Sequence, residues 1–150
     1  GFLLNNELTD FSFVPVDNGK PVANRVEGGK RPRSSMSPTI AYDARGRVAI
    51  VTGSPGGSAI INYVAKTLLA IIDWQLDPQA AVALPNFGSR NGPTELEAGT
   101  AVAGLAPKLR VLGAQVAVIE LTSGAQAIVR TREGWIGGAD PRREGIVMGQ

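Results

Sequence analysis

The sequence predicts an α+β layered domain built on a largely antiparallel sheet. Short runs rich in β-branched residues recur along the chain and are separated by glycine-bearing turns, as is typical of antiparallel strands. One long run of apolar, helix-forming residues lies between them, so strands and helices are grouped rather than strictly alternating. At 150 residues the chain is long enough to bury a core, and we assign residues 1–150 to a single domain.

The first forty residues are expected to contain little regular structure. A short apolar run at residues 2–4 is expected to be a strand, and the turn-prone pair Asn5 and Asn6 follows it. Residues 14–38 are punctuated by prolines and by Asn-Gly and Gly-Gly pairs, which forbid a long regular element. We therefore predict a loop there.

A hairpin, a glycine turn and a helix are predicted next. Residues 39–42 and 47–51 flank a turn that contains Gly46 and are expected to pair as a β-hairpin. The turn at residues 52–58 reads TGSPGGS, and residues 59–76 beyond it are almost wholly apolar. Because apolar residues cover most of the circumference of this segment, we predict a buried or sandwiched helix.

The remaining elements follow from caps and breakers. Asp77 and Pro78 are typical N-cap and N1 residues, so they predict a second helix, which Pro85 ends. Later glycines separate the other runs. The expected elements are the helix at 79–84, a loop at 86–93, a strand at 94–97, a surface helix at 99–113, strands at 115–121, 125–130 and 134–138, and a closing loop at 139–145.

Composition excludes several classes of function. Lys and Arg total 15 against 13 Asp and Glu, and a formal charge of +2 does not argue for nucleic acid or an anionic membrane as partner. Cysteine and histidine are absent, so this chain alone offers no disulfide, thiol nucleophile, histidine-based triad or histidine metal ligand. The longest apolar run, residues 59–72, is interrupted by Asn62 and Lys66 and is too short to span a bilayer.

The glycine turn at 52–58 is the first candidate site. A strand, a turn and a helix in that order leave main-chain N–H groups free, and Gly56 and Gly57 place no Cβ in the way of a ligand. The residue directly before Ser58 is not a lysine, so the Walker phosphate loop does not fit. The glycines also lack the G-x-G-x-x-G spacing of the dinucleotide-binding loop. The remaining alternatives do not involve a bound phosphate. The remaining functional interpretation is a pair of donors for an oxyanion in acyl transfer, although glycines at such turns are more often structural.

Two polar clusters precede the turn. Glu7 and Asp10 lie three residues apart and can share one face of a tight turn, which suits an ammonium group. From the spacing alone, two solvated turn carboxylates are the simpler interpretation. Ser34 and Ser35 offer hydroxyl and main-chain donors between prolines, which suits a carboxylate, but serine-rich loops without a binding role are common.

Four segments in series make the sequence recognisable. They are LLNNELTDFS at 3–12, KRPRSSMSPTI at 30–40, TGSPGGS at 52–58 and GADPR at 138–142. In this order the chain resembles the C-terminal part of the small subunit of γ-glutamyltransferases (γ-glutamyltranspeptidases), which belong to the N-terminal nucleophile hydrolase superfamily. The resemblance covers nearly the whole chain and implies part of an αββα sandwich with largely antiparallel sheets.

The resemblance also implies a role for each cluster. The acidic pair that matches Glu7 and Asp10 holds the α-amino group of the γ-glutamyl donor in the family, and the serines that match Ser34 and Ser35 bind its α-carboxylate. The main-chain N–H groups of the glycines that match Gly56 and Gly57 form the oxyanion hole. The implied enzyme cleaves γ-glutamyl amides such as glutathione through a γ-glutamyl-enzyme and passes the group to water, an amino acid or a peptide.

Other expectations come from the resemblance as well. No metal or organic cofactor is implied, and neither is nucleic acid or a membrane span. The expected location is periplasmic or secreted, in an enzyme made as a zymogen that processes itself. The sequence leaves open the oligomeric state, the acceptor and the balance between hydrolysis and transfer.

Parts of the family's machinery do not match residues of this sequence. The family nucleophile is a threonine at the N-terminus of the small subunit, whose own α-amine serves as base, whereas this sequence begins with Gly1. We therefore expect a processed or truncated chain. Its expected partners are the N-terminal part of the small subunit and the large subunit, which supplies an arginine for the α-carboxylate. Smaller departures are Arg33, where many relatives have an apolar residue, and the lack of histidine at 85–93.

Two other functions stay open. A related acylase on the same fold would remove a glutaryl side chain from a β-lactam, but that substrate lacks the α-amino group and leaves Glu7 and Asp10 without a partner. The second alternative is a catalytically incomplete module that contributes only structure or binding.

Overall fold

The computed structural model describes residues 4–149, and the chain separates into two compact units, Gly1–Ser35 and Met36–Gln150. The assignment of residues 1–150 to one domain stays a prediction. The strand expected at 2–4 lies outside the described residues except for Leu4, which has no regular structure.

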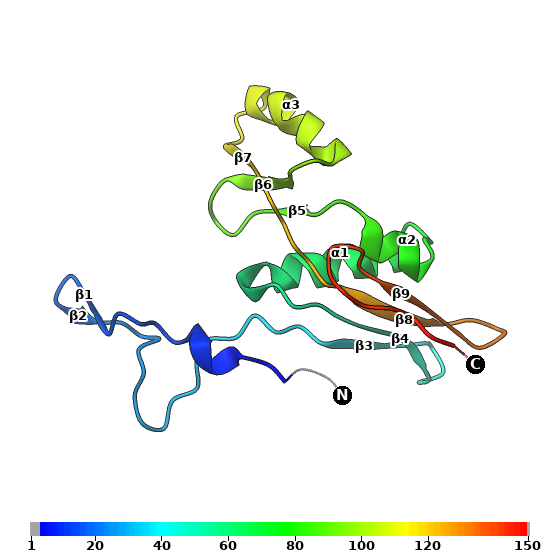
Figure 1. The fold of residues 1–150 in the computed structure, drawn as a ribbon, viewed down its shortest axis with the longest axis horizontal. Helices are drawn as coiled ribbons and strands as arrows, with labels where there is room; N and C mark the ends of the chain where they lie inside the picture. The colour runs from blue at the N-terminus through cyan, green and yellow to red at the C-terminus, as the bar shows by residue number, and fades with distance from the viewer. Residues whose placement is uncertain (1–3, 150) are drawn as a thin grey trace. The chain divides into compact units, whose positions relative to one another are not determined.

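The first unit contains one helical turn and one short ribbon. The 3-10 helix η1 spans Glu7–Asp10, and β1 (Val16–Asp17) pairs antiparallel with β2 (Lys20–Pro21) (Figure 1). Asn18 and Gly19 between the strands have φ angles of 47° and 73°, as a type I′ turn requires. The prediction that residues 14–38 contain no long regular element is confirmed, since β1 and β2 have two residues each, and the Asn-Gly pair forms a short hairpin within the loop.

The second unit is built on a four-stranded antiparallel sheet in the order β3-β4-β8-β9 (Figure 1). Its strands are β3 (Thr39–Tyr42), β4 (Val48–Gly53), β8 (Gln126–Arg130) and β9 (Trp135–Ala139). The hairpin expected between β3 and β4 is confirmed, with an irregularity in register between Ala41 and Tyr42. Strand β4 also pairs with the distant β8, so that Thr52 lies opposite Ala127.

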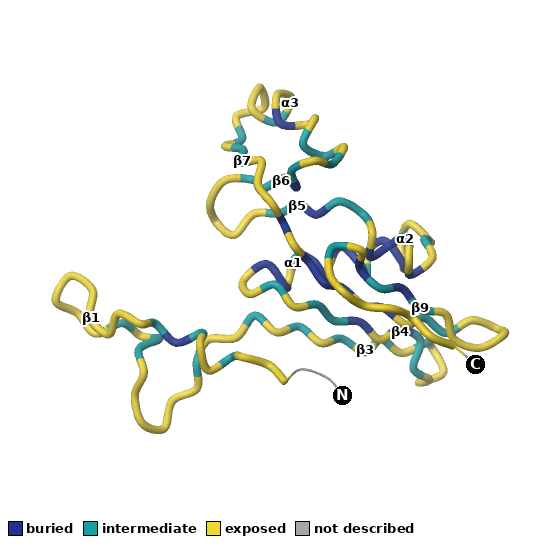
Figure 2. Tube along the Cα trace, viewed as in Figure 1, coloured by how far each residue is buried: buried dark blue, intermediate teal, exposed yellow. Residues whose placement is uncertain are grey.

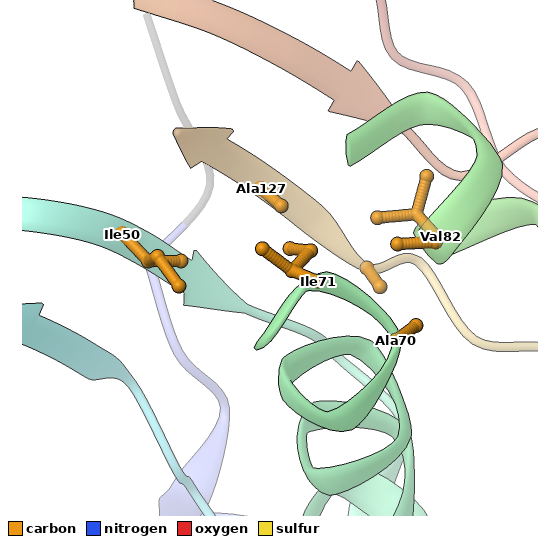
Figure 3. Packing of buried hydrophobic residues seen from close by; sticks show 7 residues of the cluster. Ile50, Ala70, Ile71, Val82 and Ala127 are labelled. Atoms are coloured by element: carbon orange, nitrogen blue, oxygen red, sulfur yellow. The ribbon is translucent and has the colours of Figure 1, made fainter. Parts of the chain in front are cut away.

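Two helices cover one face of this sheet. They are α1 (Ile60–Ile72) and α2 (Pro78–Ala83), and Ile71 of α1 points toward Ile50 of β4 and Ala127 of β8 (Figure 3). The Asp77 carboxylate accepts a 3.0 Å hydrogen bond from the Ala80 N–H, which confirms the predicted N-cap. Helix α2 lies directly on β9, since a Cβ at Gly138 would be 2.4 Å from the Pro78 carbonyl oxygen.

Helix α1 is shorter and less buried than predicted. It ends at Ile72, after which Gln75 has a φ angle of 56° and the Leu76 N–H donates back to the Ala70 carbonyl. Ile61 and Ile72 are 55% and 50% exposed, so one side of the helix faces away from the core. Within this chain, the helix predicted to be buried or sandwiched is therefore covered on one side only.

The other face of the sheet carries an uncovered apolar row. The register places Ile40, Val51 and Ile128 side by side, and all three are exposed. A hollow of about 550 Å³ lies beside them and is lined in part by Ile146 and Met148 of the C-terminal segment. Burial is instead concentrated in α1, α2 and the adjoining strands (Figure 2). A sheet face this apolar is typical of a surface that packs against another layer.

A second, three-stranded sheet has the order β5-β6-β7. It comprises β5 (Phe87–Gly88), β6 (Thr94–Glu97) and β7 (Val116–Ile119), and the 3-10 helix η3 (Ala101–Leu105) and α3 (Ala106–Val111) connect β6 to β7. The strand at 94–97 is confirmed, whereas β5 lies in a segment predicted to be a loop. The pair β6–β7 is parallel, an exception to the antiparallel pattern.

The α+β class with mainly antiparallel sheets is confirmed. Within residues 4–149, the helices are all too short or too polar to cross a membrane. The helix predicted at 99–113 divides into η3 and α3 because Pro107 occupies the first turn of α3, where its missing N–H is tolerated.

Candidate active site

The glycine turn joins the end of β4 to the start of α1. Gly56 and Gly57 have φ angles of 140° and 55°, conformations that glycine adopts readily and other residues rarely. Gly57 begins the short 3-10 helix η2 (Gly57–Ala59), and the first N–H groups of a helix have no partner within it. Among residues 4–149, neither the Gly56 N–H nor the Gly57 N–H donates to a main-chain oxygen. The turn therefore presents two neighbouring donors.

The Tyr63 side chain of α1 packs against Gly56 of the turn. A Cβ at Gly56 would lie 2.5 Å from Cε2 of the Tyr63 ring, and Tyr63 is only 4% exposed. Burial, and then the negative charge of Glu97, raise the pKa of Tyr63 above its ordinary value, so its hydroxyl stays neutral. Sequence reasoning placed Tyr63 in the helix but missed this contact, because helical spacing does not show which residue backs a preceding turn.

The turn also bonds to Gly124, just before β8, and to Gln126, the first residue of β8. The Ser54 hydroxyl accepts a 3.2 Å hydrogen bond from the Gly124 N–H and donates a 2.7 Å bond to the Pro55 carbonyl. The Thr52 hydroxyl donates to the Gln126 carbonyl at 2.8 Å. The turn is thus held between α1 and β8.

Arg90 places a positive charge beside the end of the turn. Its guanidinium donates to the Ser58 hydroxyl and forms a 2.5 Å ion pair with Glu95. The hydrogen bond to the Glu95 carboxylate raises the pKa of Arg90. Arg90 lies between β5 and β6, in the segment 86–93. Sequence reasoning noted only that this segment lacks histidine, so it missed Arg90.

A buried polar cluster joins the segment before β8 to the segments that follow α2 and β9. Arg142 pairs with Glu97 at 2.5 Å and with Asp140 at 2.9 Å. The Asn86 side-chain amide donates to the Ser123 hydroxyl at 2.8 Å, and Ser123 in turn donates to Asp140. Burial raises the pKa of Asp140, but hydrogen bonds from Ser123, Arg142 and Ala125 outweigh it and hold the pKa below its ordinary value. The GADPR segment thus holds the core of a structural network.

Lys66 joins this cluster from α1. The side chain is 5% exposed, and its ammonium group donates to the carbonyls of Leu84 at 2.6 Å and Val82 at 3.4 Å. Burial, and then the positive charge of Arg142, lower the pKa of Lys66 to about 8. A lysine that seemed merely to interrupt an apolar run therefore caps the C-terminal carbonyls of α2.

The acidic pair lies together in the first unit. Glu7 and Asp10 are the first and last residues of η1, the tight turn that their spacing suggested. The Oε1 atom of Glu7 is buried and accepts no hydrogen bond from the described residues. A buried carboxylate oxygen without a donor is costly, so this atom needs a donor from a ligand or another part of the protein.

Asn24 connects the acidic pair to the serine segment. Its side-chain amide donates to the Asp10 carbonyl at 2.7 Å, and its oxygen accepts from the Arg33 N–H at 2.9 Å. Arg33 directly precedes Ser34 and Ser35, which end the first unit. Sequence reasoning did not single out Asn24, because its bonds join segments on either side of it in the chain.

The predicted residues thus form two groups. Glu7, Asp10, Ser34 and Ser35 belong to the first unit, and Gly56 and Gly57 belong to the second. Their union in one site, and the role of each, stay predictions. Among the described residues, clusters of three or more Asp or Glu side chains suited to a metal ion are not found.

Comparison with known proteins relates this geometry to a family. The gamma-glutamyltranspeptidase family model matches residues 1–150. The glutathione hydrolase proenzyme of Escherichia coli K12 is 40% identical over 152 residues, which cover 95% of this chain and 26% of that protein. The chain therefore spans about a quarter of the length of that relative.

Solved structures of related enzymes share the fold of this chain. A mutant of Helicobacter pylori gamma-glutamyltranspeptidase is 35% identical with a TM-score of 0.77, over 95% of this chain and 82% of that chain. Cephalosporin acylase from Bacillus halodurans is 25% identical with a TM-score of 0.71, over 91% of this chain and 25% of that one. The expected N-terminal nucleophile hydrolase fold is confirmed by these likenesses. This chain belongs to the gamma-glutamyltranspeptidase family.

Proposed function

We propose that this chain provides the donor-binding and oxyanion-stabilising part of an enzyme that cleaves γ-glutamyl amides such as glutathione. The observation that carries the proposal is the glycine turn, where Gly56 and Gly57 present two main-chain donors without a main-chain acceptor among residues 4–149. Family membership and the name of the Escherichia coli relative, a glutathione hydrolase proenzyme, support the choice of reaction.

The proposed reaction is an acyl transfer in two steps. The hydroxyl oxygen of a threonine outside this chain attacks the γ-carbonyl carbon while its proton passes to the N-terminal amine of that threonine. The carbonyl oxygen becomes an oxyanion, which accepts hydrogen bonds from the N–H groups of Gly56 and Gly57. Collapse expels the amine with a proton and leaves the γ-glutamyl ester, which water or an acceptor amine then cleaves.

The first unit recognises the zwitterionic end of the donor in this proposal. The α-ammonium group supplies the hydrogen bond that the buried Oε1 of Glu7 lacks, and Asp10 is the second acidic partner. Ser34 and Ser35 bind the α-carboxylate. Asn24 holds Asp10 and the residue before Ser34, so one amide sets the spacing of both groups.

The remaining machinery comes from partners in the same precursor. We propose that the large subunit and the N-terminal part of the small subunit supply the nucleophile, the arginine for the α-carboxylate and the second sheet of the αββα sandwich. The uncovered row of Ile40, Val51 and Ile128 supports this proposal, because an apolar sheet face of that kind suits a second sheet. The proposed enzyme is periplasmic or secreted, is activated by self-processing and uses no metal or organic cofactor.

The test uses the complete precursor and release of p-nitroaniline from its γ-glutamyl anilide. Asp10→Ala is expected to lower kcat/KM by about 100-fold, because a charge-assisted contact to the ammonium group is lost. Asp17→Ala is the matched control, since Asp17 is an exposed acidic residue of the same unit and should leave the rate unchanged. Full activity of Asp10→Ala would refute the assignment of that carboxylate.

A β-lactam acylase is the second candidate, supported by the likeness to cephalosporin acylase. Its glutaryl substrate has no α-amino group, so Glu7 Oε1 would remain without a donor. Faster cleavage of a glutaryl anilide than of the γ-glutamyl anilide would favour this alternative. Absence of turnover with either compound would favour a structural or binding module.

A further inference from the structure

Residues 123–125, which lead into β8, contact the glycine turn at Ser54 and Pro55, whereas Tyr63 contacts it at Gly56. The Gly124 N–H donates to the Ser54 hydroxyl at 3.2 Å. A Cβ at Gly124 would lie 2.7 Å from Cδ of the Arg143 side chain, 2.8 Å from Cγ of Pro55 and 3.1 Å from Cδ of Pro55. The φ angle of Gly124 is outside the left-handed region, so the close approach, not the backbone conformation, requires glycine here.

Asp140 clamps residues 123–125. Its Oδ2 atom accepts from the Ser123 hydroxyl and from the Ala125 N–H at 3.2 Å, and its own N–H donates to the Ala125 carbonyl at 2.9 Å. Asp140 is 3% exposed and is itself paired with Arg142. The bonds to Ser123 and Ala125 lie on both sides of Gly124, so Gly124 has little freedom to move.

We propose that Gly124 is a positioning residue for the oxyanion hole, and the inference rests on the proposed function above. The clamped segment holds Ser54 and Pro55 in place, and Pro55 immediately precedes Gly56. The contact between Gly124 and Pro55 therefore fixes the direction in which the Gly56 and Gly57 N–H groups point. Oxyanion stabilisation depends on donors about 2.7–3.1 Å from the developing charge. A small displacement of Pro55 should therefore move these donors and lower kcat.

The test introduces Gly124→Ala into the complete precursor. The added methyl group must displace the flexible end of Arg143 and also the rigid ring of Pro55. Because Pro55 precedes Gly56, kcat for the γ-glutamyl anilide is expected to fall by about 10–100-fold. The inhibition constant of L-glutamate should change less than kcat, because its planar γ-carboxylate develops no new charge and so depends on these donors less than the tetrahedral oxyanion does. Gly104→Ala is the matched control, since a Cβ there would contact nothing within 4 Å and φ is not in the left-handed region. It should leave both values unchanged.

A second pair of variants separates positioning from general damage. Pro55→Ala removes the ring atoms Cγ and Cδ, which the new methyl group would strike in addition to the Arg143 side chain. It should therefore restore part of the rate of Gly124→Ala, and the double variant should lose less than the product of the single losses. Ser54→Ala removes the acceptor of the Gly124 N–H without adding atoms and should lower kcat more than it changes the glutamate inhibition constant. This variant answers the question even if Gly124→Ala does not fold.

Each outcome decides the proposal. A wild-type rate for both Gly124→Ala and Ser54→Ala would overturn it, as would parallel changes in kcat and in the glutamate inhibition constant. Independent, multiplicative effects of Gly124→Ala and Pro55→Ala would also contradict it. If the unmodified precursor turns over but these variants behave like Gly104→Ala, this inference alone fails. If the unmodified precursor has no turnover, the proposed function fails and the inference fails with it.

Discussion

The two units hold their candidate residues in opposite ways. In the first unit, Glu7 and Asp10 lie on the helical turn η1, and the hydroxyl side chains lie in a segment without regular structure. The two bonds of Asn24 connect Asp10 to the residue before Ser34. In the second unit the candidate groups are main-chain donors, and Tyr63 and Gly124 both pack against the turn. A side-chain site of this kind depends on few contacts, whereas a main-chain site depends on the packing of the whole unit behind it.

The largest expected effect tests the packing of the second unit. Asp140→Ala leaves the Ser123 hydroxyl and the Ala125 N–H without a buried acceptor and takes from Arg142 one of its two carboxylate partners, so it should lower the free energy of unfolding by about 3–5 kcal/mol. Urea unfolding of the complete protein measures this. The contrast is Glu27→Gln in the first unit, whose ion pairs with Arg25 and Lys30 are at the surface and should leave the unfolding midpoint unchanged. Equal losses in the two variants would contradict the difference between the units.

Gly56→Ala should have the next largest effect, on the rate rather than on binding. Alanine at a φ angle of 140° is strained and would strike the Tyr63 ring, so kcat is expected to fall by about 100–1,000-fold. Gly53→Ala is the matched control, because it adds the same methyl group to the same turn. A Cβ at Gly53 would have no neighbour within 4 Å, so this variant should keep the wild-type kcat. Similar rates for the two variants would show that the turn is not an oxyanion hole.

Asn24→Ala should affect binding instead. Loss of the bonds to Asp10 and Arg33 is expected to weaken inhibition by L-glutamate by about tenfold, with a smaller change in kcat. Asn18→Gly removes the same kind of side chain from the β1–β2 turn at a position already in the left-handed region, and inhibition should not change. A fall in kcat without weaker inhibition would place Asn24 outside the donor site.

The last prediction concerns the pH dependence of stability, not the rate or binding. The pKa of Lys66 is lowered from 10.5 in the unfolded chain to about 8 in the folded protein, so between these values the unfolded state binds more protons. The contribution of Lys66 to the free energy of unfolding should therefore rise from pH 8 to about pH 10.5. Urea unfolding at several pH values measures the difference between the wild type and Lys66→Met, which should follow this rise. A pH-independent difference would contradict the lowered pKa.

Local patterns predicted most of the elements, and distant contacts account for what the sequence did not reveal. Strand β6 and the Asp77 cap were predictable because each depends on residues close together in the chain. The pairing of β4 with β8 was not, since Thr52 and Gln126 are 74 residues apart.

The candidate site divides in the same way. Residue type identified Glu7, Asp10, Ser34 and Ser35, and a pair of glycines identified the turn. Tyr63, Asn24 and Gly124 act through contacts that depend on the fold, and no spacing in the sequence leads to them. The exposed side of α1 was missed because an apolar sequence does not show which of its faces the chain itself covers.

The central claim is that two chemically different groups serve one zwitterionic donor. The most direct measurement is the ratio of kcat/KM for γ-glutamyl and glutaryl anilides in the complete enzyme and in its Asp10→Ala and Gly56→Ala variants. The glutaryl compound lacks only the α-amino group, so Asp10→Ala should reduce the preference for γ-glutamyl, while Gly56→Ala should lower both rates and keep the ratio. A ratio unchanged by Asp10→Ala, or altered equally by both substitutions, would contradict the account.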